Sequence, residues 1–171
     1  MAGPPLVIHI VGLKNTGKTR LMGLLVQELN SLGIETGALK HDGSGHFHWD
    51  REGTDTYGIR SAGGRVTAIL SDCEFAIQAN GGLGITLQEI TQVFFRRFDL
   101  LLVEGFKKLK GRKVEVLREG FSTHPLCTEE ELVATFGDPL FERDAPHFDS
   151  VPALAELISR LLREHTSEAS H

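Results

Sequence analysis

The sequence has little cysteine, no excess of positive charge and no long apolar run. Its 2 cysteines, Cys73 and Cys127, are far apart and belong to no CxxC pair, which excludes a disulfide scaffold and is typical of a cytoplasmic protein. A net charge of −5 disfavours a broad nucleic-acid-binding surface. Neither a membrane-spanning segment nor a secretory signal is expected, because the first apolar run is short and follows no basic region.

The chain is of ordinary globular composition, with 40% hydrophobic and 24% charged residues among 171. This length predicts a single domain, residues 1–165, followed by a disordered tail at 166–171.

Short β-branched runs alternate with segments in which leucines recur at helical spacing. Strands are predicted at 6–11, 34–40, 65–71, 74–79, 100–105, 113–117 and 132–137, and helices at 21–32, at 86–98 and from Ser150 onward. Such alternation predicts an α/β layered fold with a mostly parallel sheet flanked by helices. The strands at 65–71 and 74–79 form an extra pair.

The segment "GLKNTGKT", residues 12–19, fits G-x-x-x-x-G-K-[ST] and lies between the first predicted strand and helix. Its two glycines allow a tight turn whose N–H groups face phosphate oxygens. Lys18 would reach the outer phosphates and Thr19 would offer its hydroxyl to Mg²⁺. The sequence therefore predicts a P-loop NTPase-like fold that binds a nucleoside triphosphate, with a nucleotide-binding set of Gly12, Asn15, Thr16, Gly17, Lys18, Thr19 and Arg20.

A P-loop needs a second acidic residue for the magnesium ion or the attacking water, and "FDLLLVEG" offers Asp99 and Glu104. Five strand residues at about 3.3 Å each separate the two by roughly 16 Å. Phosphates bind beyond the carboxyl end of a parallel strand, so Glu104 is the candidate metal ligand and, with Lys18, a candidate catalytic residue. The alternative is that Glu104 only ends a strand before Gly105.

Three segments together resemble the MobB family of molybdopterin-guanine dinucleotide biosynthesis. They are "GLKNTGKTRL", "LKHDG…HFHWDREGTDTYGIRSAGG" and "LLLVEGFK", in order from about residue 6 to residue 118. The most specific matches are Lys40-His41, Asp50, Gly53, Asp55, Arg60, Ala62-Gly63 and "VEGFK". The chain departs from the family at Arg20, where a threonine is frequent, and at "DGSG" (42–45), where several members have a denser histidine pair.

The resemblance implies a small GTP-binding protein, a slow GTPase and usually a dimer. It would assist the enzyme that attaches a guanine nucleotide to molybdopterin. Guanine preference depends on the resemblance alone, since the sequence contains no Asn-Lys-x-Asp motif and Asp138 is only a weak substitute. A small metabolite kinase and a metal-delivery GTPase remain the alternatives.

The segment "LKHDGSGHFHWD", residues 39–50, has three interpretations. Its histidines His41, His46 and His48, with Asp50, could bind zinc or nickel. It could be a solvated loop. The preferred interpretation is a ligand loop in which Asp50 joins the Mg²⁺ shell, Lys40 or His41 contacts an anion and Trp49 packs on a ring or as an anchor. The resemblance adds Arg60 and Lys107 to this set.

The strand pair near residues 65–79 also predicts assembly, because exposed strand edges invite pairing with a second copy. A homodimer is expected with contacts from Val66, Ala68, Leu70 or Phe75. Alternatively, these residues cover the core of one subunit.

Overall fold

The computed structural model describes residues 3–43, 50–79 and 83–168. Contacts group the chain into two compact units, Met1–Gly43 with Thr91–His171, and Ser44–Ile90. Whether both fold as the single predicted domain stays a prediction.

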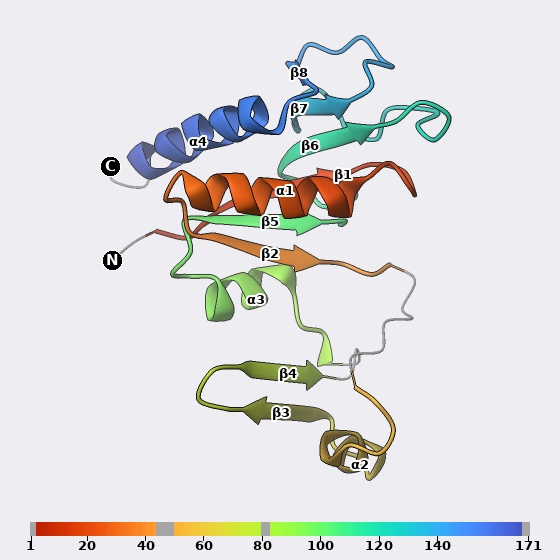
Figure 1. Cartoon of the computed structure of the whole chain (residues 1–171), viewed down its shortest axis with the longest axis vertical. Helices are drawn as coiled ribbons and strands as arrows, with labels where there is room; N and C mark the ends of the chain where they lie inside the picture. Colours follow the sequence, from red (N-terminus) through yellow and green to blue (C-terminus); the bar gives the residue numbers. More distant parts are fainter. Residues whose placement is uncertain (1–2, 44–49, 80–82, 169–171) are drawn as a thin grey trace. The chain divides into compact units, whose positions relative to one another are not determined.

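The larger unit is built on a six-stranded sheet in the order β2-β5-β1-β6-β7-β8 (Figure 1). All of its pairings are parallel, which confirms the predicted α/β class. The central strand β1 lies between β5 and β6, so the residues that follow β1, β5 and β6 meet at one edge of the sheet. The strands are β1 (Leu6–Val11), β2 (Thr36–Lys40), β5 (Leu100–Glu104), β6 (Arg112–Leu117), β7 (Leu132–Gly137) and β8 (His147–Phe148).

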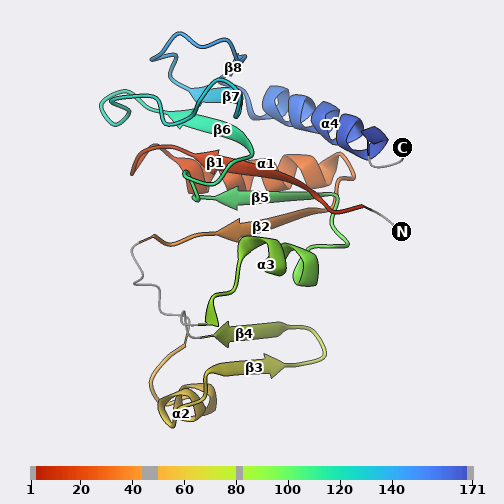
Figure 2. The ribbon, with the colours of Figure 1, turned by 180° about the vertical axis from the view of Figure 1, so that it is seen from behind.

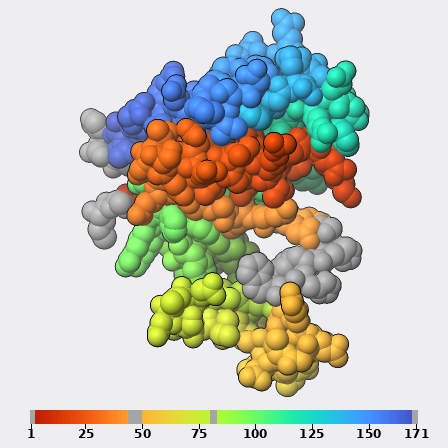
Figure 3. All heavy atoms as spheres, viewed as in Figure 1, coloured from red at the N-terminus to blue at the C-terminus, as the bar shows by residue number. Residues whose placement is uncertain are grey.

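Two helices, α1 (Lys18–Ser31) and α4 (Val151–Glu168), cover one face of this sheet. Each helix packs an apolar stripe against alternate residues of the strands, and the residues at the centre of the two stripes, Leu25 and Ile158, are fully buried. Figure 3 shows the side chains of the two helices meeting over this face, and Figure 2 shows the strands from the other side. Helix α4 continues to Glu168, so residues 166–168 are helical and not the predicted tail.

The smaller unit contains helix α2 (Asp55–Ser61) and an antiparallel pair, β3 (Val66–Leu70) with β4 (Phe75–Ala79). The strand pair was predicted, whereas α2 was not. The sequence did contain a signal for this helix, since Thr54 is a residue type preferred at the N-cap. In the structure its hydroxyl accepts a hydrogen bond from the Tyr57 N–H, as an N-cap residue does.

Helix α3 (Leu87–Phe94) is shorter than the predicted 86–98. Two of its apolar residues, Val93 and Phe94, have exposed side chains. The chain leaves the helix at Phe95, whose ring lies where a side chain on Gly37 would otherwise stand. Strand β8, only two residues long, was also not predicted. Among the described residues, no helix is both long and apolar enough to span a bilayer.

Candidate functional site

The loop from Val11 to Lys18 connects β1 to α1 and is shaped by two glycines. A Cβ on Gly12 would lie 2.7 Å from both the Thr16 Oγ1 atom and the Val116 carbonyl oxygen, so only glycine fits there. Gly17 has φ 98°, in the left-handed region, immediately before the first residue of α1. The buried Thr16 hydroxyl closes the loop by donating to the Leu13 carbonyl at 3.0 Å.

Lys18 folds back over this loop. Its Nζ atom donates to the Leu13 carbonyl at 2.7 Å. Burial lowers the pKa of Lys18, Glu104 acts in the opposite direction, and the ammonium groups of Lys40 and Lys107 lower it further. A half-buried ammonium group among other cations is stabilised when an anion binds beside it.

Glu104 and Thr19 meet at the same edge of the sheet. The Thr19 hydroxyl donates to Glu104 Oε2 at 2.8 Å, and Lys40 Nζ lies 3.2 Å from Thr19 Oγ1 and 3.4 Å from Glu104 Oε1. Strand register explains the contact between Lys40 and Glu104, because these two residues are neighbours in the parallel pair β2–β5. Asp99 lies before the opposite end of β5, where its carboxylate accepts from the Glu35 N–H at 2.9 Å. Glu104, and not Asp99, therefore reaches the P-loop.

These groups line a cavity of about 580 Å³, a size typical of small-ligand pockets. Five of its lining residues are cationic and one is acidic, although the whole chain has a net charge of −5. The cavity therefore suits a polyanion of limited size. Its lining residues are Lys14, Asn15, Gly17, Lys18, Thr19, Arg20, Lys40, Glu104 and Arg118.

Two of these residues, Lys14 and Arg118, were not assigned from the sequence. Arg118 follows β6, its Nη1 atom donates to the Asn15 carbonyl at 3.2 Å, and its Cζ atom lies 4.7 Å from the centroid of the Phe121 ring. Lys14 lies within the predicted P-loop, where its charge was the available signal. Arg118 gave no local signal, because β6 comes about a hundred residues after the P-loop.

The donor set fits a magnesium ion. Mg²⁺ prefers hard oxygen ligands at about 2.0–2.1 Å, and the Thr19 hydroxyl and the Glu104 carboxylate are such ligands beside each other. Asp50, the third predicted ligand, belongs to the smaller unit. There its carboxylate accepts bonds from the hydroxyls of Thr54 and Thr56, and the first of these lowers its pKa most. Its role in the magnesium shell stays a prediction.

The other predicted ligand-loop residues are divided between the units. In the larger unit, the His41 N–H donates to the Glu104 carbonyl at 2.9 Å, and the Lys107 carbonyl accepts from Lys113 Nζ at 2.9 Å. In the smaller unit, the Arg60 guanidinium lies 5.5 Å from the centroid of the Tyr57 ring.

His46, His48 and Trp49 lie outside the described residues, as do residues 80–82. Within residues 3–43, 50–79 and 83–168, no three His, Cys, Asp or Glu side chains group as metal ligands.

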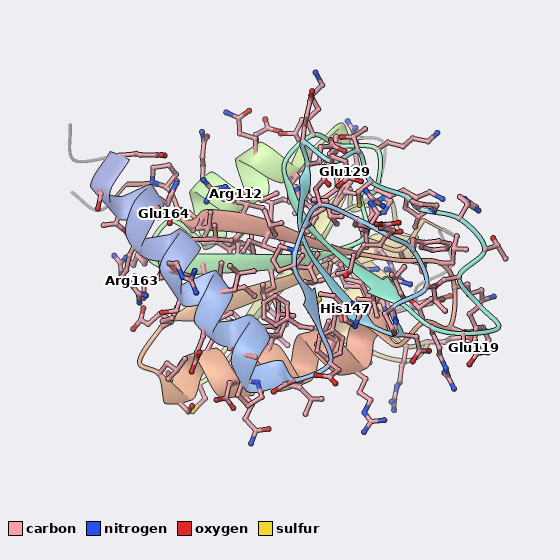
Figure 4. The ribbon with its side chains drawn as sticks, turned by 90° about the horizontal axis from the view of Figure 1, so that it is seen from above. Arg112, Glu119, Glu129, His147, Arg163 and Glu164 are labelled. Carbon is pink, nitrogen blue, oxygen red and sulfur yellow. The ribbon has the colours of Figure 1, made fainter. Side chains whose placement is uncertain are left out.

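Asp138 follows β7, the second strand from β1 on this side of the sheet. Its carboxylate accepts from the Glu119 N–H at 2.7 Å, and its own N–H donates to the Leu117 carbonyl at 3.1 Å. These bonds join the loops that follow β6 and β7. Figure 4 shows Glu119 in the first of these loops, on the side away from Arg163 and Glu164 of α4.

The parallel sheet with a P-loop between β1 and α1 defines a P-loop NTPase-like protein. A family model described as "Molybdopterin guanine dinucleotide synthesis protein B" matches residues 7–138. The chain belongs to this family, MobB.

Similar proteins agree with this membership. The chain is 29% identical over 160 residues to the molybdopterin-guanine dinucleotide biosynthesis adapter protein of Haemophilus influenzae, covering 91% of this chain and 89% of that one. It is 28% identical over 167 residues to the adapter protein of Escherichia coli, covering 92% and 95%. The crystal structure of Bacillus subtilis MobB superimposes with a TM-score of 0.68 at 27% identity, covering 92% and 97%.

Proposed function

We propose that the chain binds GTP with Mg²⁺ and acts as an adapter in the biosynthesis of molybdopterin-guanine dinucleotide. The observation that carries the nucleotide part is the cavity at the P-loop, in which five cations surround the Thr19–Glu104 pair. The adapter part is supported by family membership and by the relatives from Haemophilus influenzae and Escherichia coli, which are named as adapter proteins of this biosynthesis.

In this proposal each residue has a definite task. The N–H groups of residues 12–19 surround the phosphates, and Lys18 exchanges its bond to the Leu13 carbonyl for phosphate oxygens. Thr19 and Glu104 hold Mg²⁺, which neutralises phosphate charge. Arg118 fixes the P-loop through the Asn15 carbonyl. Hydrolysis would be slow, with Lys18 and Glu104 as its catalytic residues.

Titration of the purified chain with GTP, ATP and molybdopterin, with and without Mg²⁺, tests this function. Tight, Mg²⁺-dependent GTP binding supports it, whereas the absence of any triphosphate binding contradicts it. Thr19→Ala should remove most of the gain in affinity that Mg²⁺ gives and keep the Mg²⁺-independent part. An equal loss with and without the ion would contradict the assigned role of Thr19.

We also propose that the chain forms a homodimer through the β3–β4 pair. The antiparallel register places Val66, Ala68, Leu70, Phe75 and Ile77 on one face of the pair, since side chains alternate along each strand. All but Ile77 are the residues predicted to form the contact. The face is apolar and exposed, with exposed fractions of 78% at Leu70 and 51% at Phe75.

A two-stranded sheet on its own is marginally stable in water, so covering this face would stabilise the smaller unit. The enzyme that attaches the guanine nucleotide to molybdopterin is the second proposed partner.

A further inference from the structure

The ammonium group of Lys40 lies on the two side chains that would hold the metal. Its Nζ atom is 3.2 Å from Thr19 Oγ1 and 3.4 Å from Glu104 Oε1. Thr19 already donates its own hydrogen to Glu104 Oε2, so a lone pair of the hydroxyl oxygen faces Lys40. Lys40 therefore uses the oxygen atoms that a magnesium ion would need.

The two cations exclude each other by distance and charge. Mg²⁺ binds oxygen at about 2.0–2.1 Å and demands near-octahedral geometry, which leaves no room for an ammonium group on the same oxygen lone pairs. Two positive charges a few ångströms apart also repel.

We propose that Lys40 is a built-in counter-ion that occupies the magnesium position when no metal is bound and competes with the metal for it. This inference rests on the proposed function, because it concerns the same site. Lys40 keeps Glu104, whose side chain is only 10% exposed, from being left as an unpaired carboxylate. It thereby holds Thr19 and Glu104 in place before the metal arrives.

Replacement of the Lys40 ammonium group by the metal requires only the Lys40 side chain to move. The backbone beside Lys40 is fixed in position, because the His41 N–H donates to the Glu104 carbonyl and the centroids of the His41 and Phe106 rings lie 4.0 Å apart. The Lys40 side chain itself is 58% exposed and has a flexible four-carbon stem. Once displaced, it stays in the lining of the cavity and can donate to a phosphate oxygen.

This competition predicts that a single substitution of Lys40 weakens nucleotide binding and tightens metal binding. Lys40→Met removes the charge and keeps the length. GTP affinity in excess chelator should fall, because a cation near the phosphates is lost. The Mg²⁺ concentration at half-maximal enhancement of GTP binding should fall as well, by about two- to fivefold, the range for an ion pair with an exposed partner.

Matched variants isolate the effect. Lys14→Met removes the same charge from the same cavity, and it should weaken GTP binding at every Mg²⁺ concentration without shifting the Mg²⁺ midpoint. Lys40→Arg keeps the charge and should keep the midpoint within twofold of the parent chain. A midpoint for Lys40→Met that is unchanged or higher overturns the proposal.

Mn²⁺ binding without nucleotide, followed by electron paramagnetic resonance, separates this proposal from the proposed function. Lys40→Met should bind Mn²⁺ about two- to fivefold more tightly than the parent chain. If the parent chain binds no nucleotide, the proposed function fails, while this measurement still decides the role of Lys40. Equal or weaker Mn²⁺ binding by Lys40→Met, or binding by neither protein, refutes the competition. Circular dichroism of each variant checks that it is folded.

Discussion

Replacing Gly12 by alanine should damage both the stability of the chain and its nucleotide site. The added Cβ would lie 2.7 Å from Thr16 Oγ1 and from the Val116 carbonyl oxygen, closer than a carbon and an oxygen atom normally approach. The Val116 carbonyl belongs to β6 of the central sheet and cannot move alone, so the P-loop must move instead. Overpacking of this kind costs about 1–3 kcal/mol.

The displacement would also strain the bond from the Thr16 hydroxyl to the Leu13 carbonyl, which is worth about 1 kcal/mol. The free energy of unfolding should therefore fall by roughly 2–4 kcal/mol, which lowers Tm by roughly 4–16 °C for a chain of this size. GTP affinity should fall at least about tenfold, because the N–H groups of the loop no longer converge.

Gly23→Ala is the matched control. Gly23 lies inside α1, and a Cβ there meets nothing within 4 Å. Since alanine favours a helix by about 0.5–1 kcal/mol over glycine, this variant should unfold at a slightly higher temperature and bind GTP as the parent chain does. Thermal unfolding and calorimetric titration measure both properties. A Gly12→Ala protein that is as stable as Gly23→Ala and binds GTP equally well would refute the packing argument.

Three further predictions address the phosphate contact, pH and assembly. Lys18→Ala should lower triphosphate affinity roughly 10- to 150-fold in calorimetric titrations while the protein stays folded, and unchanged affinity would refute the P-loop assignment. Burial lowers the pKa of His9 most, and the positive charge of Lys113 lowers it further. As pH falls below about 6.5, this histidine therefore binds a proton in the unfolded chain before it does so in the folded chain. The free energy of unfolding should then drop by up to about 1.4 kcal/mol per pH unit, and His9→Gln should abolish this slope while His124→Gln, at an exposed position, should not. Ala68→Glu should convert the dimer to monomers in light scattering with little change in GTP binding, and a chain that is monomeric at micromolar concentration would exclude the dimer.

The parts of the fold that sequence could predict are those with local signals. The run of apolar residues in β5 and the glycine before α1 indicated a buried strand and a phosphate loop without any tertiary information. The choice of Glu104 over Asp99 needed only the rise per residue and the rule that ligands bind beyond the carboxyl ends of parallel strands. The four candidate contact residues taken from the sequence, Val66, Ala68, Leu70 and Phe75, also lie on one exposed face of the β3–β4 pair.

Elements and contacts that depend on distant partners escaped prediction. Helix α3 ends early because Phe95 packs where Gly37 has no side chain, and these residues are 58 positions apart. His9 was counted within an apolar strand, although it lies beside Lys113 on β6. The contact of Lys40 with Thr19 and Glu104 follows from the β2–β5 register, which no single segment of sequence encodes.

Charge shows the same division between local and distant information. A net charge of −5 describes the average surface, yet five cations gather around the P-loop cavity. Three of them lie within or directly after the P-loop, while Lys40 and Arg118 come from β2 and from the end of β6. The parallel sheet brings them together because the carboxyl ends of its strands meet at one edge. A fold of this topology can therefore build a positive cavity from an acidic chain, because strand order adds Lys40 and Arg118 to the three cations that the P-loop segment already supplies.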